Sequence, residues 1–154
     1  MTADNLRTEI EIEFQSMRII LKELSELQRD VHGRSVSVRE KAAAAAFMAN
    51  FYNGIENILK RISRYYRIPV PTGDTWHLDL FQRFCAPAYT PLPEVFDDKT
   101  ASEIAPYRRF RHVVYHGYAF DLEWDRMSEG IEKAADVFAR FESTIHNFIE
   151  TLIS

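Results

Sequence analysis

The chain has 154 residues, of which 46% are hydrophobic and 27% are charged, and its formal net charge is −4. This size and composition predict one globular domain over residues 1–154. No apolar run approaches the ~20 residues needed to cross a bilayer, and the N-terminus lacks the basic region and apolar stretch of a signal peptide. We therefore expect a cytoplasmic protein without a membrane span. The single cysteine, Cys85, excludes an intramolecular disulfide and a cysteine-based metal cluster, and we interpret it as a small apolar filler.

Positive charge is concentrated in two segments without acidic residues, residues 57–73 and 104–120. Because the net charge is negative, the rest of the chain is strongly acidic. A local basic strip on an acidic body predicts binding of a polyanion at one place. Two solvated helix faces would give the same charge pattern, so charge alone leaves both interpretations open. The basic residues are Lys60, Arg61, Arg64 and Arg67 in the first segment and Arg108, Arg109 and Arg111 in the second.

Apolar residues recur at helical spacing in two long segments at the start of the chain. Residues 5–31 predict one helix that Gly33 ends, and residues 36–66 predict a second. Five consecutive alanines, Ala42 to Ala46, favour a helix and allow another helix to approach closely. Gly54 costs about 1 kcal/mol against alanine within a helix, so we expect either close packing or approach of a ligand at this position.

A proline-rich connection follows at residues 67–99 and contains five of the six prolines. It is expected to hold one short helix at about 74–85, with Asp74 as the N-cap. In the following helix, the spacing of Thr100 and Glu103 predicts a capping box. Pro106 then predicts a kink or a restart of that helix.

The helix that contains Pro106 is expected to end at His116, with Gly117 in a left-handed conformation. A final helix at about 122–152 carries a heptad seam that packs inside the bundle, between protomers, or both. No segment shows the alternation typical of a strand. We therefore predict an all-α, up-and-down bundle of four long helices plus one short helix. The seam consists of Trp124, Met127, Ile131, Ala134, Phe138, Phe141, Ile145, Phe148 and Leu152.

The candidate functional residues are Arg111 and His116, an Arg-x4-His pair in a basic and aromatic segment. At 100° per residue the two lie about 140° apart around the helix and about 7.5 Å apart along it, so they cannot meet on one phosphate unaided. Either Gly117 loosens the helix end and frees His116, or a second protomer contributes its own copy of the segment. Arg140 and His146 nearly repeat the pair in the last helix, and we treat them as a decoy.

These residue types suit cleavage of RNA without a metal ion. Histidine titrates near neutral pH, so His116 can take the proton of a ribose 2′-hydroxyl and let that oxygen attack the adjacent phosphorus. Arginine stays charged and binds phosphate oxygens in a bidentate manner, so Arg111 can stabilise the negative charge that develops in the transition state. Tyr115 or Tyr118 can stack on a base or donate to phosphate. The residues expected to bind RNA are Arg108, Arg109 and Tyr115.

Three further residues are expected to support this site. Asn53 and Glu56 share one face of the second helix, where they either support a site on a neighbouring helix or form an ordinary surface pair. His112 is the polar residue directly after Arg111. His77, on the short helix, is expected to be structural rather than catalytic.

Other interpretations of these residues remain open. His112 and His116 share a helix face at i and i+4 and could hold a divalent metal, although no His-Glu-x-x-His pattern accompanies them. Both histidines could instead pack and cap the helix. At the level of the whole chain, the alternative is a non-catalytic helical module that binds RNA or a nucleotide, or that regulates a partner.

At these residues the sequence resembles the HEPN superfamily and, more narrowly, the HepT-like toxins of bacterial toxin–antitoxin pairs. The superfamily pattern, Arg-polar-x(3–5)-His late in an all-α bundle, is matched by Arg111-His112-x3-His116. Tyr118 matches the HepT-type extension, Arg-x4-His-x-Tyr. The order of elements agrees over nearly the whole chain. Two departures are His112, where asparagine is more familiar, and the long proline-rich connection.

The resemblance implies a metal-independent endoribonuclease that needs no cofactor. It implies a homodimer in which the two motifs face each other across the interface, with RNA as the substrate. It also implies a minimal nucleotidyltransferase antitoxin as a partner. In that family the antitoxin can inactivate the toxin by AMPylation of the motif tyrosine, which is Tyr118 in this sequence.

Overall fold

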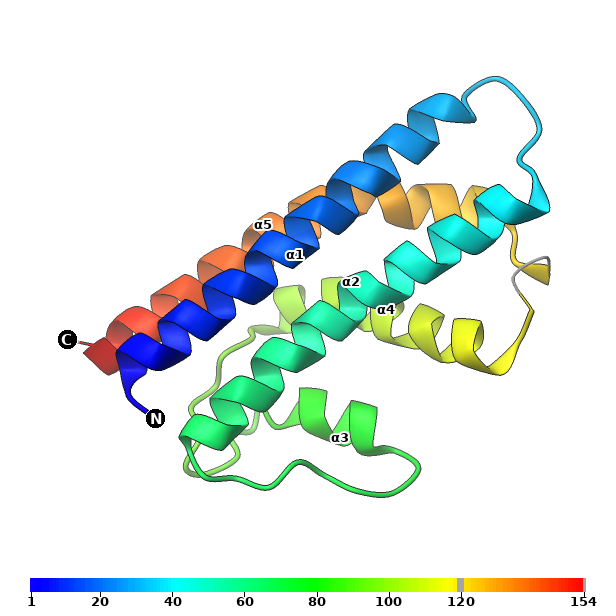
Figure 1. The fold of residues 1–154 in the computed structure, drawn as a ribbon. Helices are drawn as coiled ribbons and strands as arrows, with labels where there is room; N and C mark the ends of the chain where they lie inside the picture. The colour runs from blue at the N-terminus through cyan, green and yellow to red at the C-terminus, as the bar shows by residue number, and fades with distance from the viewer. Residues whose placement is uncertain (119–120, 154) are drawn as a thin grey trace.

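The computed structural model describes residues 1–118 and 121–153, and these residues form five α-helices without a strand. Four helices are long and one is short, which confirms the predicted all-α class (Figure 1). Over the described residues, none of the helices has an apolar stretch of the length that a bilayer crossing requires. The helices are α1 (Ala3–Asp30), α2 (Val38–Tyr65), α3 (Trp76–Gln82), α4 (Asp98–His116) and α5 (Trp124–Ile153).

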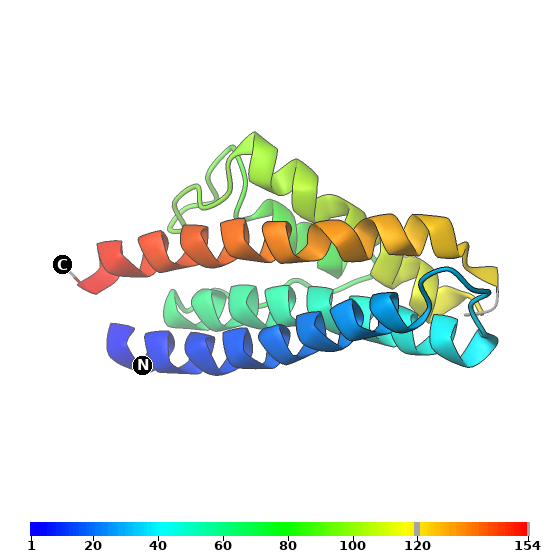
Figure 2. The same ribbon diagram turned by 90° about the horizontal axis from the view of Figure 1, so that it is seen from above.

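The core forms where α1, α2 and α5 run alongside one another, with both chain termini at one end of the bundle (Figure 2). Aromatic rings from the three helices meet there: the Phe138 centroid lies 5.8 Å from that of Phe14 and 6.5 Å from that of Phe51. Most of the heptad seam of α5 is buried within this single chain, and its end residues, Trp124 and Leu152, pack against the core half-buried. The seam therefore packs inside the bundle.

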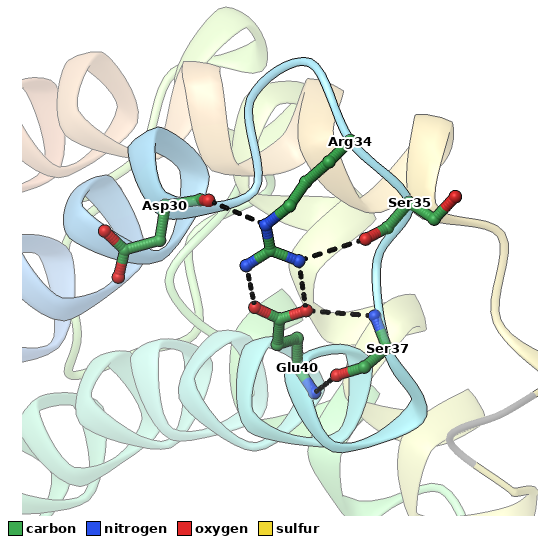
Figure 3. A network of polar contacts seen from close by, with 5 residues as sticks. All are labelled: Asp30, Arg34, Ser35, Ser37 and Glu40. Atoms are coloured by element: carbon green, nitrogen blue, oxygen red, sulfur yellow. Dashed lines mark hydrogen bonds and ion pairs between the residues drawn. The ribbon is translucent and has the colours of Figure 1, made fainter.

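The connection from α1 to α2 is held by a compact polar network (Figure 3). α1 ends at Asp30 with Val31 as its C-cap, and Gly33, which was expected to end the helix, lies in the turn that follows, in the left-handed region at φ 77°. Arg34 makes two hydrogen bonds to the carboxylate of Glu40, of 2.9 and 2.6 Å. Ser37 and Glu40 also form a capping box, because each side chain accepts the other residue's backbone N–H. These bonds fix the start of α2.

Close packing explains the glycine in the middle of α2. A Cβ atom built on Gly54 would lie 2.6 Å from Cγ and 2.8 Å from Sδ of Met17, which is fully buried on α1. The prediction of close packing at Gly54 is therefore confirmed, and α1 and α2 approach each other over this residue.

The proline-rich connection folds against the core instead of extending away from it. The carbonyl of Phe84 accepts hydrogen bonds from the backbone N–H groups of Val95 and Phe96, at 3.0 and 2.9 Å. The Phe96 ring then packs 5.4 Å from that of Phe81 on α3. The short helix begins later than expected, with Thr75 rather than Asp74 at the N-cap position and without a capping bond from the Thr75 side chain.

The structure corrects the expected cap and the expected end of α4, and it excludes a restart at Pro106. The N-cap is Asp97, whose side chain accepts the N–H of Thr100 at 2.7 Å, so Thr100 and Glu103 form no capping box. Glu103 instead pairs with Arg140 of α5. Pro106 lies inside one continuous helix, which does not restart there. Gly117 has φ −139° and ψ −169°, an extended conformation rather than a left-handed one.

Candidate functional site

Groups on three different helices surround the guanidinium of Arg111. Its Nε donates a 2.6 Å hydrogen bond to Oδ1 of Asn53 on α2. Its Nη1 lies 3.2 Å from Nε2 of His77 on α3. Its Cζ lies 4.3 Å from the centroid of the Tyr115 ring, one helical turn further along α4, in a cation–π contact. The orientation of the guanidinium is thus fixed by contacts at two of its nitrogens and on one face of its plane.

Behind His77 lies the carboxylate of Glu56, a residue that is only 2% exposed. Its two oxygens are 2.7 and 2.9 Å from Nδ1 of His77. A carboxylate accepts hydrogen bonds and does not donate them, so Nδ1 carries the proton. In the neutral ring, Nε2 is then a free acceptor aimed at Arg111. The polar chain runs from Glu56 through His77 to Arg111.

Tyr52 lies one turn before Glu56 on α2 and is fully buried. Its hydroxyl group makes no hydrogen bond that meets geometric criteria within the described part of the chain. Burial and then the negative charge of Glu56 raise the pKa of this phenol well above its usual value. Tyr52 therefore stays neutral, and Glu56 is the buried negative charge on this side of the site.

His116 is not part of the Arg111 cluster. Its ring lies against that of His112 in a tilted arrangement, with centroids 4.3 Å apart and planes at 41°, and both residues are exposed. No hydrogen bond or ion pair joins either imidazole to another described residue. The structure thus brings Arg111 together with Asn53, Tyr115 and, through His77, with Glu56. It does not bring Arg111 and His116 of one chain together.

The residues expected to bind RNA differ in how open they are. Arg109 is exposed, and Tyr115 is 56% exposed even though its hydroxyl accepts a 3.4 Å bond from Asn53. Arg108 is half-buried, with its guanidinium 5.4 Å from the centroid of the Phe81 ring. Tyr118, the motif tyrosine, is 70% exposed. The open part of this surface therefore runs along the end of α4.

The other basic segment is less available to a polyanion. Arg61 makes ion pairs with Glu9 at 2.8 Å and with Glu13 at 3.0 Å, which tie α2 to α1. Both partners raise the pKa of Arg61 through hydrogen bonds. Lys60 lies 4.6 Å from the centroid of the Trp76 ring. This segment is at least partly structural.

The decoy pair of α5 has structural partners. Arg140 pairs with Glu103 of α4, and His146 lies 2.6 Å from Oε1 of Glu11 on α1. Each contact joins α5 to a different helix. The structure therefore gives Arg140 and His146 separate roles in holding the bundle.

The two main hollows among the described residues are not lined by Arg111 or His116. A hollow of about 590 Å³ between α4 and α5 is lined by Pro106, Phe110 and Lys133, among others, but not by Arg111 or His116. Residues 1–118 and 121–153 contain no group of three or more His, Cys, Asp or Glu side chains that could hold a metal ion. In a single chain His116 is thus an exposed residue outside both hollows.

His77 was not among the residues expected at the site, yet it lies between Glu56 and Arg111. It stands 21 residues from Glu56 and 34 from Arg111, and no periodic pattern links positions that far apart. Only the folding of the proline-rich connection against α2 and α4 brings these three side chains together. In the sequence, the feature that bears on the position of His77 is the short helix that carries it, whose apolar residues were expected to pack on the bundle.

A family model described as HepT-like protein matches residues 43–152, which run from the second turn of α2 through nearly all of α5. The match covers Asn53, Glu56, His77 and the whole motif segment. No curated protein and no solved structure matches the chain.

Proposed function

The chain belongs to the HepT-like family, and from that membership and the site geometry we propose that it is a metal-independent endoribonuclease of the toxin type. The observation that supports this most directly is the held guanidinium of Arg111. Nε and Nη1 are engaged by Asn53 and His77, whereas Nη2 has no hydrogen-bond acceptor among the described residues. A fixed cation with one guanidinium nitrogen free to donate suits a phosphate oxygen.

In the proposed reaction the ribose 2′-oxygen is the nucleophile. His116 accepts the 2′-hydroxyl proton, the oxygen bonds to the adjacent phosphorus, and the bond from phosphorus to the 5′-oxygen breaks. The departing 5′-oxygen takes up a proton, for which the second imidazole, His112, is available 4.3 Å away. Arg111 neutralises the charge on the non-bridging oxygens. The products are a 2′,3′-cyclic phosphate and a 5′-hydroxyl end.

A second copy of the chain completes the proposed site. Within one chain, Arg111 contacts α2 and α3, while the His116 ring lies against that of His112. A two-fold axis beside α4 would place the His116 of one protomer opposite the Arg111 of the other. We therefore propose a homodimer with composite sites, in which Arg109 and Tyr115 extend the RNA surface and Arg108 lines its edge.

A minimal nucleotidyltransferase antitoxin is the proposed partner. It would transfer AMP from ATP to the phenolic oxygen of Tyr118 and release pyrophosphate. Tyr118 is 70% exposed and lies two residues after His116, so an enzyme can reach it. The attached phosphodiester would add a negative charge beside the RNA surface, and that charge would repel the RNA backbone.

The test is cleavage of an end-labelled RNA by the purified protein with and without EDTA. We expect cleavage in both conditions, a 2′,3′-cyclic phosphate end, and complete loss of activity in His116→Ala with unchanged helical circular dichroism. His146→Ala is the matched control, because His146 is also a histidine on a long helix and lies outside the motif. Loss of activity with EDTA and recovery with Zn²⁺ would support the metal interpretation instead.

The exposed aromatic and basic end of α4 also fits a non-catalytic module that binds RNA. That function predicts RNA binding that depends on Arg109 and Tyr115, with no cleavage even at high protein concentration. Equal cleavage by the wild type and His116→Ala would point to a contaminating nuclease and would contradict the proposed enzyme.

A further inference from the structure

We infer that His77 is a positioning residue, which accepts a hydrogen bond from Arg111 and thereby fixes the guanidinium for its work on the phosphate. The inference rests on the proposed function and deepens it, because it assigns the orientation of Arg111 to a residue outside the motif. It also gives the proline-rich connection, a departure from the family pattern, a role in the site.

The first step in the argument is the direction of the hydrogen bonds. Glu56 is 2% exposed, and its carboxylate lies 2.7 Å from Nδ1 of His77. The carboxylate fixes the proton on Nδ1, so Nε2 presents a lone pair to Nη1 of Arg111 at 3.2 Å. A ring with the opposite tautomer would turn an N–H toward the guanidinium and lose both bonds.

The second step is the rigidity of the imidazole. Glu56 projects from the middle of α2, and α3 is anchored by the buried side chains of Leu80 and Phe81. The Trp76 ring lies 3.6 Å from that of His77, centroid to centroid, with 31° between the planes. Lys60 covers the same indole at 4.6 Å. The imidazole is thus held both through its Nδ1 and by its neighbours.

The third step is what this does to Arg111. Asn53 fixes the Nε edge, His77 fixes Nη1, and Tyr115 lies against the face of the guanidinium. Three constraints from three helices leave little rotational freedom for a side chain that otherwise loses much entropy when it binds. A displacement of about 1 Å in such a group can cost about a hundredfold in rate.

A purely structural His–Glu pair is the competing explanation, and the chain contains a reference for it. His146 and Glu11 form the same kind of pair, with Nε2 and Oε1 2.6 Å apart, between α5 and α1. That pair is half-exposed on both sides, with side chains 45% and 40% exposed, whereas Glu56 is buried. The pairs differ most in the second ring nitrogen, which in His77 faces Arg111.

The kinetic test compares three substitutions at one position. Glutamine places an amide oxygen near the position of Nε2, asparagine places its polar atoms near Nδ1, and phenylalanine places none. We expect kcat/KM for RNA cleavage to fall about tenfold to a hundredfold in His77→Phe and His77→Asn, and less in His77→Gln. His146→Gln is expected to match the wild type. Equal losses in all three His77 variants would overturn the inference.

A second comparison asks whether His77 acts through Arg111. In an Arg111→Lys background the acceptor at Nε2 has lost its guanidinium partner, so His77→Phe should cause little further loss. A full additional loss in that background would assign His77 a purely structural role. Thermal unfolding of each variant separates these effects from simple loss of the fold.

A spectroscopic test needs no RNA, and its first part needs only the wild-type protein. In the ¹⁵N NMR spectrum of the wild-type protein, we expect His77 to show a protonated Nδ1 and an unprotonated Nε2. We also expect a sharp Nε–H signal from Arg111 that broadens in His77→Phe, and less in His77→Gln. A protonated Nε2, or an Arg111 signal unchanged in both variants, would overturn the inference. Absence of RNA cleavage by the wild type would contradict only the proposed function.

Discussion

The imidazoles of His112 and His116 lie 4.3 Å apart, centroid to centroid, on consecutive turns of α4. Both are exposed, and within the described residues no hydrogen bond or ion pair joins them to the cluster that holds Arg111. In-line displacement at phosphorus requires one group to remove a proton and another to deliver one. A pair of neighbouring imidazoles supplies two such groups in one place.

His112→Asn is therefore expected to slow RNA cleavage about a hundredfold or more, because the 5′-oxygen would leave without a proton. A uridine 3′-(4-nitrophenyl phosphate) substrate has a leaving group that needs no protonation, so its cleavage should change little. The measurement is kcat/KM for both substrates with the wild type and the variant. Equal losses on both substrates would show that His112 does not protonate the leaving group.

Gly54→Ala is expected to lower the free energy of unfolding by about 1–3 kcal/mol through overpacking. The new Cβ would lie 2.6 and 2.8 Å from atoms in the middle of the fully buried Met17 side chain. Urea unfolding followed by circular dichroism measures the change. Gly130→Ala is the matched control, because its Cβ would meet only the terminal methyl of Met48, which can move. A Gly54→Ala protein as stable as Gly130→Ala would contradict this account.

Glu40→Gln tests the electrostatic part of the network in Figure 3. The Arg34 side chain, followed by the backbone of Ser37, lowers the pKa of Glu40 from its usual 4.5 to about 2. Because the folded-state pKa is depressed, the ionised carboxylate stabilises the fold above about pH 4.5, and this contribution is lost as the pH falls through about 2.

The wild type should thus unfold at a slightly higher temperature than Glu40→Gln at pH 7, and the gap should close as the pH is lowered toward 2. The gap should also shrink in high salt, because the pair is at the surface. Thermal unfolding across this pH range is the measurement. Glutamine can still accept the N–H of Ser37, so the comparison isolates the charge. A difference in unfolding temperature that persists at pH 2 would show that the substitution acts through the helix cap of α2 and not through the charge of Glu40.

The parts of the fold that could be predicted are those that depend on periodicity within a segment. The stripe of α1 and the seam of α5 repeat over many turns, so both helices and their buried faces follow from spacing alone. The start of α4 could not be predicted in this way. Asp97 and Thr100 each stand three residues before a polar partner, and the pairing of Glu103 with Arg140 of α5 removes one candidate cap.

In the candidate site, too, the contacts that follow from helix geometry could be predicted and those that depend on the folding of a connection could not. The divergence of Arg111 and His116 follows from helix geometry, and in the structure the two side chains have different neighbours. The contact of Asn53 with Arg111 could be predicted, because a polar residue on the face of a neighbouring helix is an evident candidate for supporting the site. The contact of His77 with Arg111 could not be predicted, because it depends on how the proline-rich connection folds. The catalytic roles of these residues stay predictions.

A mixed dimer tests whether one site uses both chains. Arg111→Ala and His116→Ala protomers carry different affinity tags, are expressed together, and are purified as the heterodimer through both tags. If each site combines the Arg111 of one protomer with the His116 of the other, one of the two sites is intact and the other lacks both residues. RNA cleavage by the heterodimer should then reach about half the wild-type rate, while each parent homodimer stays inactive. A site contained within one chain would always lack one residue, so an inactive heterodimer of normal helical content would rule out the composite arrangement.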